Sequence, residues 1–392
     1  MQFCSMSNKV KKALVAACYA LATVLFIWGA ERLLPKVNTE WMEAPKQVLL
    51  EEFRFTDLYL YFHRKAEIPT YEGRQVVLLD IHAYRSREEI AQLLDSIAAA
   101  EPYLVGLDVI FGERALSDPE ADRHLTEAIR KIPKVIVASE QQAYEGGYRY
   151  ARSFFSEETG VEEGLVNFPQ GILREMSPMQ VFDGDSFPSF AYRMISEMGI
   201  SVPDEKTSWL IDYSIVDTTV LRPYIKPFNW SFLHDQIVVI GDALDMTDLK
   251  KTPFAYRVNT RMFGVQIHKQ IIQTAMSGRW FKQMHAFWTW LIMGIFLWLW
   301  ILAESIGAAI AGIWQPRGKE AEELKKKWIS TVQKTCRFVL IVLLIMIGYI
   351  LFWAFERYFE ILKVMIIAPA TLWIGRWLIG VTVHGIQKIR KK

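Results

Sequence analysis

The stretch VVLLDIHAYRSREEIAQLLDSIAAAEPYLVGLDVIF, residues 76–111, decides the fold of this chain. Its first six residues form a short apolar run typical of a buried strand, and residues 104–111 form a second one. Between these runs the apolar residues recur at helical spacing, so residues 86–100 predict a helix with one apolar face. That face consists of Ile90, Leu93, Leu94 and Ile97. A strand, a helix and a second strand in this order predict a parallel pair joined by a helical crossover.

The same alternation continues on both sides of a long middle segment. Residues 118–132 open with Asp-Pro, and proline suits the first helical position because its missing N–H would be unpaired there. Strand-like runs follow at residues 135–138 and 237–240, and a helical pattern covers residues 265–276. Residues 144–227 predict a strand-and-loop insertion with a helix near residues 190–198. This alternation predicts an α/β domain with a mainly parallel sheet. The apolar runs described next add four transmembrane α-helices and make this domain extracytoplasmic, which completes the predicted fold class.

Four apolar runs are long enough to cross a bilayer, which takes about 20 residues. They cover residues 13–30, 286–303, 338–355 and 364–383. Blocks of lysine and arginine precede the first run, separate the second from the third, and follow the fourth. Such blocks mark the cytoplasmic side, and four crossings place all three blocks on one side. Both termini are therefore predicted to be cytoplasmic, with the α/β domain outside.

The predicted segments follow from these runs. They are the cytoplasmic N-terminus (1–12), a transmembrane helix (13–34), the extracytoplasmic domain (35–283), a second helix (284–314), a cytoplasmic basic loop (315–334), a third helix (335–355), a short outer loop (356–360), a fourth helix (361–384) and the cytoplasmic C-terminus (385–392). The first span is either a retained anchor or a cleaved signal peptide, and Val15–Cys18 faintly resembles a lipoprotein cleavage box. In the basic loop, Glu322 and Lys326 are spaced for a short charged helix, with a solvated loop as the alternative.

Net charge and cysteine content argue against a nucleic-acid-binding protein and against a domain held by disulfides or cysteine-bound metal. The formal net charge of +2 is close to neutral, which argues against nucleic acid as a partner. The cysteines are Cys4, Cys18 and Cys336, so none lies between residues 38 and 283. The predicted domain therefore has no disulfide framework and no cysteine metal site, and core burial must stabilise it.

Candidate binding residues follow the predicted strands, because ligands of open α/β sheets lie beyond the carboxyl ends of the strands. The candidates are Asp80, His82, Asp108, Asp242, Asp245 and His268. Carboxylates with a histidine suit a cation or a basic ligand. The alternative is structural: Asp242 and Asp245 cap turns or helices, and His268 is a satisfied packing residue. No catalytic, cofactor or metal motif occurs, so we expect no enzyme, no cofactor and no metal site.

Two ionisable residues lie in or near the apolar spans. Glu304 lies at the end of the second span and Arg376 within the fourth. Such residues are costly in a bilayer and usually face protein or each other. An intramembrane ion pair is one hypothesis. The alternative is that Glu304 lies in the interface and that Arg376 reaches toward the same side.

Five stretches resemble the extracellular sensory domains of bacterial cyclases and histidine kinases known as the CHASE family, type two. They are VVLLDIHAY (76–84), GLDVIF (106–111), GLVNFPQGILREMSP (164–178), IVVIGDALDMTDLKKTPF (237–254) and FGVQIHKQIIQTAMSG (263–278). Their order, their spacing and their position before an apolar helix agree with the family. The resemblance covers roughly residues 47–280.

The resemblance implies a multi-pass sensor, or sensory subunit, of the bacterial inner (plasma) membrane. Family members often carry a kinase or cyclase after the last helix, whereas this chain ends at Lys392. We therefore expect a separate cytoplasmic or membrane effector protein as partner, besides the lipid bilayer. A homo-oligomer is left open, and no nucleic acid is expected. The alternative function is a structural or docking subunit of a membrane complex that binds no ligand, and an envelope enzyme is a third reading.

Overall fold

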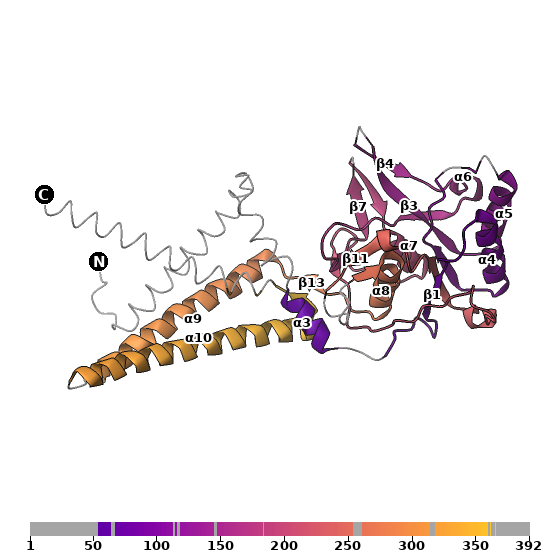
Figure 1. The fold of residues 1–392 in the computed structure, drawn as a ribbon. Coiled ribbons are helices and arrows are strands. Elements are labelled where there is room, and N and C mark those ends of the chain that lie inside the picture. Colours follow the sequence, from indigo (N-terminus) through magenta and orange to yellow (C-terminus); the bar gives the residue numbers. More distant parts are fainter. Residues whose placement is uncertain are drawn as a thin grey trace. The chain divides into compact units, whose positions relative to one another are not determined.

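The computed structural model describes residues 54–63, 67–112, 114–115, 118–144, 147–182, 184–253, 261–313, 318–359, 361 and 365. The chain divides into two compact units, Asp57–Lys282 and the combination of Met1–Thr56 with Gln283–Lys392. The first unit contains the α/β domain, and the second contains two long helices (Figure 1).

Parallel strands form the main sheet of the α/β unit. Their order across the sheet is β1 (Val76–Asp80), β10 (Ile237–Gly241), β2 (Leu104–Leu107), β3 (Val135–Tyr144) and β5 (Glu162–Leu165). Every residue of β1, β10 and β2 is buried. A strand covered on both faces shows an unbroken apolar run, which explains the sequences VVLLD, IVVIG and LVGL. β4 (Gly147–Ala151) pairs antiparallel with the second half of β3. The predicted α/β domain with a mainly parallel sheet is confirmed.

β10 comes late in the chain but lies between β1 and β2. Ile240 is the register partner of Leu79 on one side and of Leu107 on the other. The carboxyl ends of the three strands therefore meet at one edge of the sheet. This edge places Asp80, Asp108 and Asp242 at the ends of neighbouring strands.

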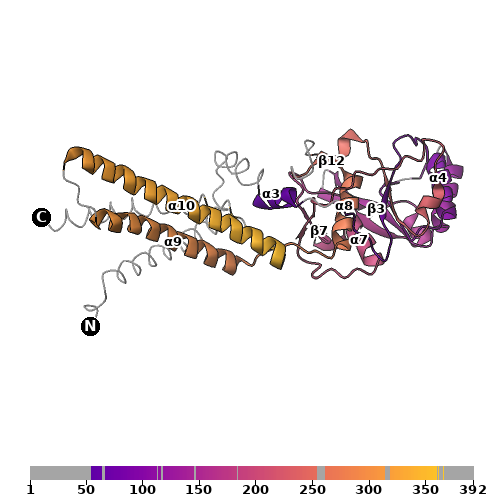
Figure 2. The same cartoon turned by 90° about the horizontal axis from the view of Figure 1, so that it is seen from below.

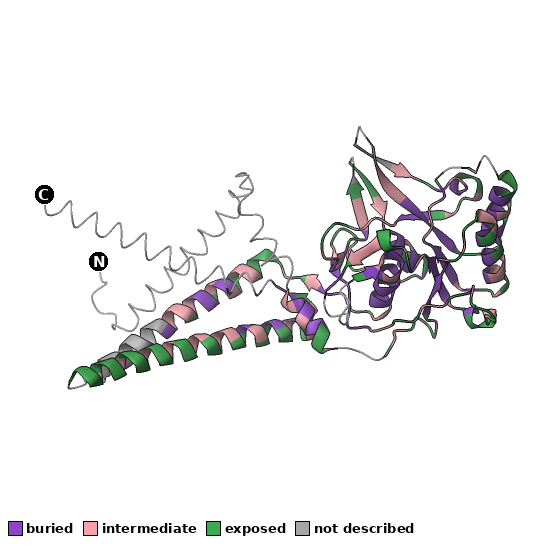
Figure 3. Cartoon of the chain, in the orientation of Figure 1, coloured by how far each residue is buried: buried purple, intermediate pink, exposed green. Residues whose placement is uncertain are grey.

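Helices cover both faces of the sheet, and Figure 3 shows the strands buried between them. α4 (Arg87–Ala99) and α5 (Pro119–Arg130) share one core with strand residues such as Val105. α4 begins with a capping box formed by Ser86 and Glu89, and the Asp118 side chain caps α5. α7 (Phe190–Glu197) and α8 (Gly264–Met276) pack on the opposite face. There a Cβ on Gly106 would lie 2.3 Å from the Met194 sulfur.

α8 is buried over nearly its whole surface. Its polar side chains therefore need partners within the protein. Lys269 Nζ lies 2.7 Å from an Asp217 carboxylate oxygen, and Gln270 donates to the Asp212 carbonyl at 2.7 Å. His268 differs from these residues, as described below.

The segment between β4 and α8 consists mostly of short elements. They are α6 (Ser156–Thr159), β6 (Glu175–Met176), β7 (Met179–Phe182), β8 (Asp185–Pro188), β9 (Trp209–Leu210), η3 (Trp230–Leu233), η4 (Met246–Asp248), β11 (Leu249–Lys251) and β12 (Arg261–Phe263). β6 pairs with β9, β7 with β8, and β11 with β12, all antiparallel. α7 is the helix expected near residues 190–198, whereas the four-residue α6 was not expected.

A buried ion pair ties α3 (Phe55–Phe62) to this segment. Asp57 is fully buried, and Arg174 is 5% exposed. The guanidinium donates from Nε to the Asp57 carboxylate oxygens at 3.0 and 3.1 Å, and from Nη2 at 2.8 Å. This bidentate geometry is the favourable one for a pair removed from water.

The second unit contains α9 (Ala286–Ile313) and α10 (Lys319–Phe355), which run side by side (Figure 2). The short strands β13 (Lys282–Gln283) and β14 (Arg357–Tyr358) flank them in the chain. Arg337 of α10 stacks over the Trp300 ring of α9 with its guanidinium carbon 5.4 Å from the ring centroid. Both helices are long and apolar enough to cross a membrane, and only 22% and 17% of their apolar windows are buried. A core helix of a soluble domain would bury most of that surface.

α10 has 37 residues, which corresponds to about 55 Å and exceeds the roughly 30 Å of a bilayer core. Its first turns carry the charged sequence KEAEELKKKW, so the segment that the sequence left open between loop and helix is helical from Lys319. The first predicted span lies outside the described residues, and so does the fourth apart from single residues at its start. The same holds for Arg376 and the side chain of Glu304, so their ion pair remains a hypothesis.

Candidate functional site

The carboxylate of Asp80 is the centre of a buried network at the carboxyl edge of the sheet. It is fully buried and accepts hydrogen bonds from the backbone N–H groups of His82 (3.0 Å) and Ala243 (3.1 Å). The Tyr224 hydroxyl donates to it at 2.7 Å, and Arg222 Nε lies 3.4 Å away. These partners satisfy the carboxylate, so Asp80 joins the loops after β1 and β10 and is not free to bind a ligand.

His82, Asp242 and Asp245 lie beside this network at the surface. His82 Nδ1 lies 3.0 Å from Asp242 Oδ1, and both side chains are about one third exposed. The Asp242 carboxylate also accepts the Leu244 N–H at 2.8 Å, and Asp245 accepts the Thr247 N–H at 2.8 Å. Asp242 and Asp245 thus play the turn and capping roles that the sequence left open. The Thr247 hydrogen bonds hold the pKa of Asp245 below its usual value.

Asp108 and His268 form a separate group, in which the His268 side chain is buried and the Asp108 side chain is partly exposed. His268 Nε2 lies 4.0 Å from Asp108 Oδ2, which is beyond hydrogen-bonding distance. Burial, and secondly the nearby charge of Asp248, raise the pKa of Asp108 to about 7. Burial lowers the pKa of His268 to about 3, so the imidazole is neutral at physiological pH. The six candidate residues therefore belong to two groups and do not form one site.

The His268 ring packs between two aromatic side chains. Its centroid lies 4.6 Å from that of Phe168 and 5.0 Å from that of Phe190. The side chain is 2% exposed, and neither ring nitrogen has a hydrogen-bond partner among the described residues. The packing role expected for His268 is thus present, but its polar atoms are not satisfied. An unpaired buried polar group is costly, and such groups in native proteins usually serve another purpose.

His268 lies in the wall of a pocket of about 310 Å³, here named the His268 pocket. Its wall is formed by side chains that include Leu165, Glu175, Met179, Ser189, His268 and Ile271. These residues come from β5, β6, β7, the start of α7, and α8. The pocket touches Gln141 within β3 and Leu165 at the carboxyl end of β5, and ligands of open α/β sheets bind beyond the carboxyl ends of strands.

Ser189 is a second unpaired polar group in this wall. It occupies the N-cap position of α7, where a serine hydroxyl normally accepts a backbone N–H, but it makes no such bond. Its Oγ is buried and has no partner among the described residues. Close packing fixes the start of α7 here, since a Cβ on Gly164 would lie 2.4 Å from the Phe190 Cα.

Two side-chain amides of the wall, those of Asn167 and Gln180, are already paired. Asn167 accepts the Gln141 N–H at 2.5 Å and donates to the Gln141 carbonyl at 3.2 Å. Gln180 Nε2 donates to the Asn167 carbonyl at 3.0 Å. Ser189 and His268 are the residues of this wall whose buried side-chain polar atoms have no partner among the described residues.

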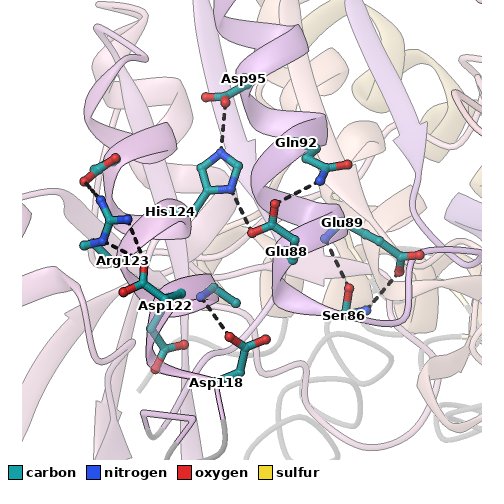
Figure 4. A network of polar contacts seen from close by, with 12 residues as sticks. Ser86, Glu88, Glu89, Gln92, Asp95, Asp118, Asp122, Arg123 and His124 are labelled. Carbon is teal, nitrogen blue, oxygen red and sulfur yellow. Dashed lines mark hydrogen bonds and ion pairs between the residues drawn. The ribbon is translucent and has the colours of Figure 1, made fainter.

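A third group of titratable residues joins α4 to α5 (Figure 4). His124 of α5 lies between two carboxylates of α4, with Nδ1 2.8 Å from Glu88 and Nε2 3.0 Å from Asp95. These hydrogen bonds raise the pKa of His124. Arg87 and Asp122 form a neighbouring ion pair. All these groups are paired with each other, so this cluster stabilises the helix junction.

Among the described residues, no three histidine, cysteine or carboxylate side chains converge as a metal site would require. The sequence located His268 and the strand-end carboxylates but missed Ser189, Phe168 and the rest of the pocket wall. Most of these residues lie in the irregular segment between β5 and α7, for which the sequence predicted no side-chain arrangement. The one available signal was Ser189 immediately before the helix expected at residues 190–198, and it indicates only a cap.

A comparison with protein families gives one match, in which the CHASE2 domain model covers residues 47–310. The chain belongs to the CHASE2 domain family. CHASE2 is an extracellular sensory domain family, so the resemblance inferred from the five stretches is confirmed. The CHASE2 match includes the whole sheet, the His268 pocket and α8, and it extends into α9. Searches of curated proteins and of solved structures found no match.

Proposed function

We propose that this CHASE2 chain is a multi-pass sensory subunit of the bacterial inner membrane. Its outer domain binds a ligand in the His268 pocket, and its helices pass that state to a separate effector protein. The family supports a sensory role, and the two apolar helices support anchoring in the membrane. The observation that carries the proposal is the His268 pocket, whose wall includes two buried unpaired polar groups.

The order of elements along the chain supports transmission. His268 lies on α8, which ends at Met276, and α9 begins soon afterwards at Ala286. A shift of α8 on ligand binding would therefore act directly on the connection to a membrane helix. Nearly all of α8 is buried, and packed elements move as units between discrete arrangements.

The charged start of α10 is the proposed contact with the effector. Leu324 is 60% exposed and Trp328 is 48% exposed, and they lie one helical turn apart among lysines. In the predicted topology this segment projects from the membrane on the cytoplasmic side. It thus offers an apolar strip with basic flanks to a partner protein.

A state-dependent cross-linking experiment tests this function. A photo-reactive amino acid replaces Trp328 in the full chain, and Ser177, an exposed residue of the pocket wall, is replaced by cysteine. Cys4, Cys18 and Cys336 are replaced by serine, so that N-ethylmaleimide labels only the pocket. The matched control is Ser231→Cys, which is exposed and does not line the pocket.

We expect cross-linking in native membranes to capture one effector protein. Labelling of Ser177→Cys should change the cross-linking yield at least threefold, whereas labelling of Ser231→Cys should leave the yield unchanged. A partner captured equally in both states would contradict the sensor. It would favour the alternative, a docking subunit of a membrane complex.

A further inference from the structure

We infer that the His268 pocket binds a small uncharged molecule carrying a hydroxyl or carboxamide group, and that Ser189 and His268 are its hydrogen-bonding partners. This inference rests on the proposed function and names the ligand class of the same pocket. It concerns binding alone and requires no transmission through the membrane helices.

The need for a ligand follows from the two unpaired groups. Ser189 Oγ and both ring nitrogens of His268 have lost contact with water without gaining a partner in the described protein. A ligand group that reaches them gains hydrogen bonds without having to desolvate these protein atoms first. The start of α7 supports this argument. Ser189 is at the N-cap position but makes no cap hydrogen bond, so its hydroxyl remains available to bind a ligand.

The charge of the ligand follows from the charges of the wall. Among the described residues no lysine or arginine lines the pocket, and Glu175 is the carboxylate that does. His268 is neutral, because burial lowers its pKa to about 3. An anion would therefore lose its hydration without meeting a positive charge, and it would face Glu175. A neutral molecule avoids both penalties.

The functional group follows from the donors and acceptors. A neutral imidazole offers one N–H donor and one acceptor nitrogen, and a serine hydroxyl both donates and accepts. A hydroxyl or a carboxamide on the ligand also does both, so it matches the hydrogen-bonding capacity of either residue. Apolar side chains such as Leu165, Phe168, Met179 and Ile271 form much of the remaining wall and suit an apolar ring or chain. The volume of about 310 Å³ equals roughly ten water molecules, which limits the ligand to a small molecule.

Two probes of the same shape test the inference on the full chain in detergent micelles. 4-Hydroxybenzamide is neutral and carries both functional groups, whereas 4-hydroxybenzoate replaces the carboxamide with a carboxylate. Their affinities are measured by ligand-observed NMR titration at pH 7.5. The variants are Ser189→Ala, which removes no cap hydrogen bond, His268→Phe, and the control Ser231→Ala outside the pocket.

We expect the benzamide to bind at least tenfold more tightly than the benzoate. Ser189→Ala and His268→Phe should each weaken it at least tenfold, while Ser231→Ala should bind as the unmodified chain does. If His268→Phe does not fold, the affinity of Ser189→Ala for the benzamide, compared with that of the unmodified chain, tests the inference by itself. Equal affinity for both probes, unchanged affinity in Ser189→Ala, or binding of neither probe overturns the inference. The cross-linking experiment does not use these probes. A negative cross-linking result would therefore count against signal transmission to the effector, and not against ligand binding in the pocket.

Discussion

Replacing His268 with phenylalanine should make the unliganded protein more stable. The imidazole is 2% exposed, and both ring nitrogens are unpaired among the described residues. Leaving a buried polar group unsatisfied costs about 1–3 kcal/mol, and phenylalanine removes that cost while keeping an aromatic ring between Phe168 and Phe190. The larger ring opposes this gain by about 1 kcal/mol, since overpacking a core costs that much or more.

The net expectation is a gain of up to about 2 kcal/mol at pH 7.5. For a domain of this size each kcal/mol raises Tm by about 2–4 °C, so the upward shift should reach at most about 8 °C. The pKa of His268 is lowered to about 3, so its neutral burial contributes stability above pH 6.5 that is lost as the pH falls toward 3. Phenylalanine has no such loss. The advantage of the variant should therefore grow by about 1.4 kcal/mol for each pH unit below 6.5.

The assay is thermal unfolding of the full chain in detergent, followed by circular dichroism at pH 7.5 and pH 5.5. The matched control is His124→Phe, because both nitrogens of His124 are paired with carboxylates. That substitution should lower stability by about 1 kcal/mol, as for a partly exposed ion pair. If His268→Phe destabilises the protein as much as His124→Phe, the imidazole of His268 is satisfied in the folded state. The argument for a ligand at this position would then fail.

Three further predictions concern the α/β unit. Asp95 and Glu88 raise the pKa of His124, so the stabilisation that the protonated His124 provides is full below about pH 6.5 and is lost as the pH rises through the raised pKa. In urea titrations, the free energy of unfolding should therefore fall less between pH 6 and pH 9 in His124→Gln than in the unmodified chain. Arg174→Met should cost about 3–5 kcal/mol in the same assay, because the buried Asp57 carboxylate loses its guanidinium partner, whereas the exposed Arg123→Met should be close to neutral; equal costs would refute the role of the pair. Gly164→Ala should cost about 1–3 kcal/mol, because its Cβ would meet the Phe190 backbone, and Gly112→Ala, in open space, should be neutral; a neutral Gly164→Ala would show that α7 can move away.

Much of the α/β fold could be predicted because strands and helices have distinct local signatures. The runs at residues 76–79 and 237–240 are apolar throughout, as is typical of strands buried on both faces, and Asp118-Pro119 marks a helix start in the sequence alone. The strand order could not be predicted in this way. β10 lies between β1 and β2 although some 130 residues separate it from β2, and no local pattern records such a pairing.

The site was predictable only in part, for a related reason. The rule that ligands bind beyond the carboxyl ends of strands located Asp80, Asp108 and Asp242 correctly at one edge. Whether each carboxylate is free or satisfied depends on residues far away in sequence, such as Tyr224, which donates to Asp80. The same holds for His268, whose missing partners can be recognised only when its surroundings are known.

The central claim is that the state of the outer domain reaches the charged start of α10. Hydrogen–deuterium exchange of the full chain in lipid nanodiscs measures this directly. The Ser177→Cys chain lacking other cysteines is compared before and after labelling with N-ethylmaleimide, with Ser231→Cys as control. We predict that pocket labelling changes amide exchange both in α8 and in residues 319–334 of α10, and that the control changes neither. A change confined to the residues around the pocket would contradict the account.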